Sequence, residues 1–114
     1  DREYKFVLSI HLDGDEPEKV IRQFYTLNSA YSIPEYCVEP NRFQSETCSG
    51  WACEYGLMKG KGLRLCKVIF ETPFRYLSLT FSAEPEGYAD GRQMFDKILY
   101  SFRLEDNKPE TVTD

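Results

Sequence analysis

The four cysteines are the residues of this 114-residue chain with the widest range of possible chemistry. They are Cys37, Cys48, Cys53 and Cys66, and four cysteines allow three disulfide pairings. Cys53 and Cys66 fall on neighbouring predicted strands, so they form the first pair to test for a disulfide, provided that they share a face of the sheet. Zinc ligation would need short paired spacings, which this set lacks. The alternative is that all four are free and pack as small hydrophobic side chains.

The single histidine, His11, restricts the catalytic chemistry that the chain can perform. A nucleophile–base pair of His11 with Cys48 or Cys53 is conceivable in space, but no local motif supports it. A structural or surface histidine explains His11 more simply. We therefore expect no enzyme, no cofactor and no metal. A cysteine-dependent enzyme stays open as an alternative, to be tested by alkylation and disulfide mapping.

Two charged clusters have simple structural explanations. Asp13, Asp15, Glu16 and Glu18 lie at a predicted strand-to-helix junction, but they lack the spacing and the closing glutamate of a calcium-binding EF-hand. Helix capping and compensation of the helix dipole account for the same carboxylates. The Lys-Gly-Lys-Gly run at residues 59–62 lacks the spacing and the following helix of a phosphate-binding loop. We interpret it as a hairpin turn, for which glycine supplies the positive φ.

The aromatic content of 15%, with eight Phe, eight Tyr and one Trp, exceeds what a small core needs. Tyrosine has an apolar ring and a polar tip, and it is enriched in binding surfaces. We predict a partner-binding patch around the long loop at residues 32–46. Its members are Tyr31, Tyr36, Phe43 and Trp51. The alternative is that these rings close the lid of the core.

Hydrophobic periodicity predicts an α+β fold. Residues 3–12, 47–58, 63–71 and 75–83 alternate as strands do, and residues 16–30 and 89–100 place apolar side chains at helical spacing. The loop at 32–46 has room for a short edge strand near residues 36–39, and residues 101–104 either end the second helix or form a last strand. The three later strands form an antiparallel meander with apolar residues on both faces, so we expect a sheet covered on both sides. Residues 1–104 are predicted as one globular domain and residues 105–114 as a polar tail.

Composition excludes several classes of protein. A chain of this length can bury one core, and its aromatic content excludes disorder. A net charge of −5 argues against binding to nucleic acid, which needs a basic surface. No apolar run approaches the roughly 18 residues of a transmembrane helix. The even number of cysteines and the start at Asp1 favour an exported or cell-envelope protein over a cytosolic one, while leaving the compartment open.

The segments "LRLCKVIF", "RYLSLTFSAEPEG" and "FDKILYSFRL" lie within residues 60–104. With the order strand, helix, meander and helix, they resemble the PsbP/Mog/DcrB-like superfamily. The resemblance implies an α/β/α sandwich around an antiparallel sheet. Members are mostly non-enzymatic: extrinsic photosystem subunits, Ran-binding proteins, bacterial lipoproteins and toxin-immunity proteins. No catalytic residues therefore carry over, and the four cysteines depart from what the superfamily leads us to expect.

These observations favour a non-catalytic binding module that docks a protein partner. The contacts are expected from the long loop and from the exposed edge of the meander. A small-molecule or lipid carrier, with an apolar pocket between the sheet and the helices, is the first alternative. A cysteine-dependent enzyme is the second.

Overall fold

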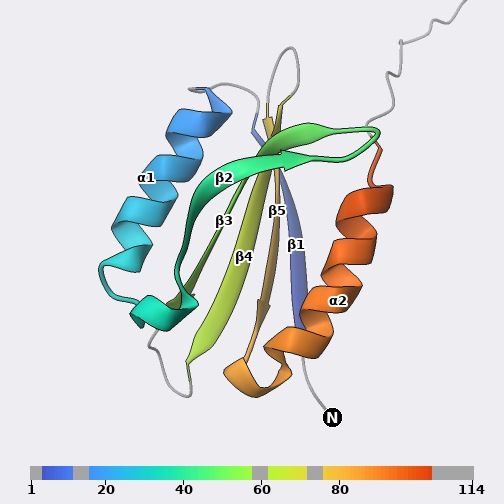
Figure 1. Ribbon diagram of the computed structural model, residues 1–114. Coiled ribbons are helices and arrows are strands. Elements are labelled where there is room, and N and C mark those ends of the chain that lie inside the picture. The colour runs from blue at the N-terminus through green and yellow to red at the C-terminus, as the bar shows by residue number, and fades with distance from the viewer. Residues whose placement is uncertain (1–3, 12–15, 58–61, 72–75, 104–114) are drawn as a thin grey trace, which may run out of the picture.

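The computed structural model of the chain is a five-stranded antiparallel sheet with one α-helix packed on each face (Figure 1). It describes residues 4–11, 16–57, 62–71 and 76–103, without the side chains of residues 4, 10, 11 and 76. In chain order the elements are β1 (Tyr4–His11), α1 (Pro17–Ser29), the short 3-10 helix η1 (Pro34–Tyr36), β2 (Val38–Gln44), β3 (Ser49–Leu57), β4 (Leu63–Glu71), β5 (Tyr76–Ala83) and α2 (Pro85–Ser101). The predicted α+β class is confirmed.

The strand order in the sheet is β1-β5-β4-β3-β2. The strands β3 to β5 form the predicted meander, and β2 extends it by pairing with β3. On the other side β1 pairs with β5, from Tyr4 opposite Ala83 to His11 opposite Tyr76. The first and the second strand along the chain are therefore the two edges of the sheet.

Both faces of the sheet are apolar because side chains alternate across each strand. The face under α1 carries Trp51, Cys53, Tyr55 and Leu57 of β3, which pack with Val20 and Ile21 of α1. The face under α2 holds the larger core, which comprises Phe43, Cys48, Cys66, Val68, Phe70, Leu77, Leu79, Phe81, Ala83, Tyr88, Phe95 and Leu99.

Two elements differ in length from the prediction. The strand expected near residues 36–39 runs over Val38–Gln44, because β2 follows β3 past a bulge between Val38 and Asn41 and places Phe43 in the core. The second helix begins at Pro85 rather than at residue 89. Proline suits the first turn of a helix, and Glu86 there complements the helix dipole. The helix ends at Ser101, and the predicted tail lies outside the described residues.

Pro17 and Gly62 lie at the described ends of two connections whose other residues, 12–15 and 58–61, are outside the described part. Pro17 occupies the first turn of α1 behind Glu16, which makes no side-chain capping bond, while the predicted cap Asp15 lies outside the described residues. Gly62 has a φ of 89°, the conformation that glycine adopts without strain, directly before β4.

Candidate functional site

The four residues predicted to form a partner-binding patch lie in different parts of the structure. Tyr31 is 77% exposed, just beyond the end of α1, and Tyr36 is half-buried in η1. Phe43 is buried on the α2 face of the sheet, where its ring lies 5.8 Å from that of Phe70. Trp51 is half-buried on the opposite, α1 face. Of the four, Tyr31 and Tyr36 belong to one connection, and the set does not form a single surface.

The four cysteines are free thiols. Cys53 packs on the α1 face of the sheet and Cys66 on the α2 face, so the condition for a disulfide between them, a shared face, is not met. Burial raises the pKa of both thiols to about 12, which keeps them protonated and weakly nucleophilic near neutral pH. Cys48 is also buried, and its thiol donates a hydrogen bond to the carbonyl oxygen of Phe102 at 3.5 Å.

The structure does not bring the other described candidates for catalysis or metal binding together in a site. The side chain of His11 is outside the described part, as are Asp13 and Asp15. Glu18 is committed to an ion pair with Arg22 at 3.0 Å. Within the described residues, no group of three or more histidine, cysteine or carboxylate side chains is arranged to hold a metal ion.

A polar cluster that the sequence did not reveal lies on the α2 face beside the helix. The Glu54 carboxylate, on β3, accepts a hydrogen bond from the Tyr88 hydroxyl at 2.7 Å and pairs with Arg92 of α2 at 2.8 Å. Arg92 also pairs with Asp96 at 3.0 Å. Burial and the Glu54 charge raise the pKa of Tyr88, so that its hydroxyl is a donor throughout the ordinary pH range. The charged glutamate within an apolar strand was the available sequence signal.

Arg64 completes this cluster from β4. Its guanidinium carbon lies over two rings, 4.4 Å from the ring centroid of Tyr36 and 4.1 Å from that of Tyr88. The geometry depends on Gly56, which pairs with Arg64 across the strands: a Cβ at position 56 would come within 2.7 Å of the Tyr36 ring. The Nε atom of Arg64 is buried and has no hydrogen-bond partner. We call Tyr36, Arg64 and Tyr88 the arginine clamp.

A second stack of arginines on an aromatic ring lies on the α1 face. Arg22 and Arg42 lie 5.6 and 5.3 Å from the centroid of the Trp51 ring. Arg42 also pairs with Glu71 at 2.9 Å, and this hydrogen bond is the main reason that the pKa of Glu71 is lowered. Trp51 therefore contacts both α1 and β2 through these arginines. These contacts explain its position without a role in binding a partner protein.

The edge strand β1 exposes three consecutive apolar side chains: Phe6 at 38%, Val7 at 43% and Leu8 at 52%. Phe6 and Leu8 pair with Phe81 and Leu79, so they lie on the α2 face of the sheet, whereas Val7 lies on the other face.

The neighbouring flank of α2 extends this surface. Met94 and Ile98 of α2 are 48% and 36% exposed. Helical geometry puts them on the side of α2 away from Arg92 and Asp96, hence toward β1. We call Phe6, Val7, Leu8, Met94 and Ile98 the β1-edge surface.

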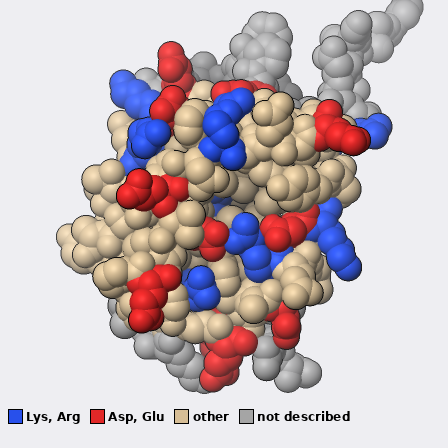
Figure 2. All heavy atoms as spheres, in the orientation of Figure 1, with Lys and Arg blue, Asp and Glu red and all other residues tan. Residues whose placement is uncertain are grey.

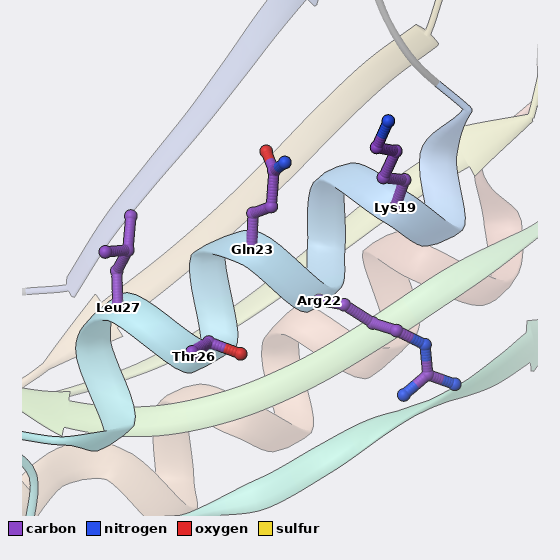
Figure 3. Close-up of a pocket in the computed structure, with 5 residues that line it drawn as sticks. All are labelled: Lys19, Arg22, Gln23, Thr26 and Leu27. Carbon is purple, nitrogen blue, oxygen red and sulfur yellow. The ribbon is translucent and has the colours of Figure 1, made fainter.

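A shallow surface depression of about 430 Å³ lies along α1. Its described lining residues are all exposed and come from the outer side of this one helix: Lys19, Arg22, Gln23, Thr26 and Leu27 (Figure 3). It does not lie between the sheet and a helix, where a carrier would enclose an apolar ligand.

Charge is distributed without a patch of one sign on the face seen in Figure 2, where acidic and basic side chains are interspersed. Among the described helices, none is long and apolar enough to cross a membrane.

The chain has an α+β fold, and comparison with known proteins finds a solved structure that is similar to it. No family model and no curated protein matches the chain, so the superfamily resemblance stays a prediction. The crystal structure of PA94 from Pseudomonas aeruginosa, described as a protein of unknown function and a candidate regulator, has the same fold, with a TM-score of 0.69 and 14% identity. The match covers 91% of this chain and 74% of that protein. At this level of identity the similarity establishes the fold alone.

Proposed function

We propose that this chain is a non-catalytic module that docks a protein partner along the β1-edge surface. The observation that carries the proposal is the run of exposed apolar side chains from Phe6 to Leu8 on a strand at the edge of the sheet. Edge strands of folded proteins are usually protected by charge, proline or a covering segment, because their free backbone groups pair readily with another strand.

The mode of docking that fits this surface is strand addition. The partner supplies an extended segment that hydrogen-bonds to the outer backbone groups of β1. Its side chains alternate, so that one set meets Phe6 and Leu8 with the α2 flank and the other meets Val7. Affinity then comes from the ladder and the buried apolar area, and specificity from the two sets of side chains.

The buried thiols support a non-catalytic role. Cys53 and Cys66 are protonated at neutral pH because burial raises the pKa of each, so neither is a ready nucleophile. Glu54 and Asp96 are both engaged in ion pairs with Arg92.

A site-specific crosslinking experiment tests the proposal. A photoreactive phenylalanine is placed at Leu8, on β1, or at Val38, on β2, which is exposed to a similar extent at 41%. Each protein is irradiated in an extract of the organism that encodes the chain, and crosslinked peptides are identified by mass spectrometry. We expect one defined partner peptide from position 8 and none from position 38.

Affinity for the identified partner is then measured with purified proteins. Leu8→Lys should weaken binding at least tenfold, because a charge enters an apolar interface. The matched variant Val38→Lys should bind as the wild type does. Equal losses for the two variants, or crosslinks confined to position 38, would contradict docking on β1.

A further inference from the structure

The exposed edge strand β1 is complementary to itself. Its residues alternate between the two faces of the sheet: Phe6 and Leu8 lie on the α2 face, and Lys5, Val7 and Ser9 on the α1 face. In an antiparallel pair, residues opposite each other point to the same side of the sheet. Two copies of β1 related by a two-fold axis perpendicular to the sheet therefore keep both faces continuous, with the axis passing through one residue of the strand.

An axis through Val7 pairs the two copies favourably. It sets Phe6 opposite Leu8 of the second copy, so that exposed apolar side chains cover each other on the α2 face. On the α1 face it sets Lys5 opposite Ser9 of the second copy, whose hydroxyl can accept a hydrogen bond from the ammonium group. The ladder then runs over residues 4–10, nearly the whole strand.

Neighbouring axes give poorer pairs because of Lys5. An axis through Lys5 itself would place two like charges opposite each other, which is destabilising. An axis through Phe6 would set the lysine against Val7 and pair residues 4–8 alone. An axis through Leu8 would set the lysine against His11, a second basic residue. The Val7 register is therefore the one that combines a long ladder with apolar contacts and no opposed charges.

The helices leave room for a second sheet beside β1. Helix α1 packs on β2, β3 and β4, toward the other end of the sheet (Figure 1). Helix α2 packs on β5 and β4, and the ring of its Phe95 lies 6.0 Å from that of Phe6. The exposed Met94 and Ile98 of α2 thus lie level with the middle of β1. In the two-fold pair, these flanks of the two α2 helices face each other above the paired β1 strands.

The size of this interface predicts weak association. A strand of eight residues is about 26 Å long, and a sheet with one helix layer on it is about 20 Å deep. The footprint is therefore about 500 Å² per copy and about 1,000 Å² in total, the lower limit for a specific interface. We expect a dimer that forms and dissociates with protein concentration.

We propose that the partner of the β1-edge surface is a second copy of this chain, paired antiparallel through β1 about a two-fold axis at Val7. The inference rests on the proposed docking function and names the partner for that surface. The product is one continuous sheet with five strands from each copy.

Disulfide trapping tests the register. Val7→Cys places two thiols on the axis, with Cα atoms about 4.5–5.5 Å apart, within the range of a disulfide. Lys5→Cys is the matched control on the same face, because this residue and its copy lie four residues apart along the pair, about 13 Å. The purified full-length variants are oxidised with copper–phenanthroline, and covalent dimer is measured by mass. The wild type is the blank for the four native thiols.

We expect at least ten times more covalent dimer from Val7→Cys than from Lys5→Cys. A mixture of Lys5→Cys and Ser9→Cys proteins should crosslink to each other, although neither crosslinks alone. Equal trapping in Val7→Cys and Lys5→Cys, or trapping in neither, would overturn the proposed pairing.

Sedimentation equilibrium measures association without a new thiol. The wild type should show a monomer–dimer equilibrium over a concentration series up to about 1 mM. Leu8→Lys should weaken this association at least tenfold, because it sets a charge against Phe6 of the second copy. Val38→Lys, on the β2 edge and exposed to a similar extent, is the matched control and should associate as the wild type does. Equal losses in the two variants would contradict pairing through β1.

The failure of this inference is distinguishable from the failure of docking on β1. If the wild type stays monomeric at the highest concentration while position 8 crosslinks to another protein in the extract, the second copy is the wrong partner and the docking surface stands. If position 8 crosslinks neither to another protein nor to this chain, docking on β1 fails as well.

Discussion

The two edges of the sheet differ in what protects them. The β2 edge carries Glu39, Pro40, Asn41 and Arg42, and it has a bulge that shifts its register against β3. Charge, proline and bulges are the devices by which proteins prevent an edge from pairing with another strand. The β1 edge has an unbroken eight-residue register with β5 and presents consecutive apolar side chains to solvent. Among its described residues, β1 has one exposed lysine, Lys5, but no proline and no bulge, whereas β2 has charge, proline and a bulge. This contrast favours β1 as the edge that pairs with another strand.

The β2 edge is also anchored in the core, whereas the apolar side chains of β1 are half-exposed. Phe43 is 7% exposed and contacts the rings of Phe70 and Tyr100, with centroids 5.8 and 5.3 Å away. If β2 is a structural edge, its removal from the core should be costly. If β1 is a binding edge, changes there should leave the fold intact. The following predictions test both halves of this contrast.

The largest effect is expected for Phe43→Ala. Deleting a buried ring leaves a cavity beside Phe70, and the free energy of unfolding should fall by about 3–5 kcal/mol. Chemical denaturation measures it. The control is Tyr31→Ala, also an aromatic residue of the predicted patch but 77% exposed, for which a change within about 0.5 kcal/mol is expected. Similar losses in the two variants would mean that β2 is not the anchored edge.

A smaller loss is expected for Gly50→Ala, on β3 opposite Phe43. A Cβ at this position would overlap the carbonyl oxygen of Ile69 and lie 2.8 Å from the Cα atom of Phe70, so the backbone of β3 or β4 must move. We expect a loss of about 2–3 kcal/mol, as for other overpacked core positions. Ser49→Ala, at the neighbouring residue, is the control in the same denaturation experiment. An unchanged stability of Gly50→Ala would show that β2 and β3 accommodate the extra group.

Much of the fold follows from the sequence because alternation and helical spacing are local properties. The period-two pattern placed β1, β3, β4 and β5 within one or two residues of their ends, and the apolar spacing placed α1. The β2 strand was largely missed, because Pro40 and Asn41 read as a loop and the bulge breaks the alternation.

The sites depend on contacts between distant residues, and this is why the sequence did not reveal them. The arginine clamp joins η1, β4 and α2, and its existence depends on the absence of a side chain at Gly56. The predicted aromatic patch assumed that neighbours in the loop share a surface. However, Phe43 and Trp51 belong to strands whose side chains alternate, and they face opposite sides of the sheet.

Alkaline pH should lower the stability of the fold through buried thiols that lie in β3, beside β2, and in β4, but not in β5, beside β1. Cys53 on β3 and Cys66 on β4 are buried, while β5 carries no thiol. Burial raises the pKa of each thiol from its ordinary value of 9.0 to about 12 in the folded state. Below pH 9 both states are protonated and stability is unaffected. Between pH 9 and 12 the unfolded chain releases these protons first, so stability is lost as the pH rises.

The size of this loss is about 1 kcal/mol for each thiol by pH 10, from about 1.4 kcal/mol per pH unit. Denaturation of the wild type at pH 8 and at pH 10 measures it. In Cys53→Ala the loss of unfolding free energy between pH 8 and pH 10 should be smaller by the contribution of one thiol. This holds whatever the stability of the variant at pH 8. A difference that does not shrink would show that Cys53 ionises as easily in the folded state as in the unfolded one.

The smallest effect on stability, and the most direct test of the contrast between the edges, is expected for Leu8→Lys on β1 and Val38→Lys on β2. Both residues are exposed, at 52% and 41%, so the free energy of unfolding of each variant should lie within about 0.5 kcal/mol of the wild-type value.

The two variants should differ in how they associate. An apolar open edge promotes strand pairing between copies at high concentration, and a lysine on the edge opposes it. We expect light scattering of concentrated protein to fall for Leu8→Lys and to stay at the wild-type level for Val38→Lys, because β2 is already protected by its charges and its proline. If both lysines reduced scattering equally, the two edges would be equivalent in solution, and the argument that singles out β1 for a partner strand would lose its basis.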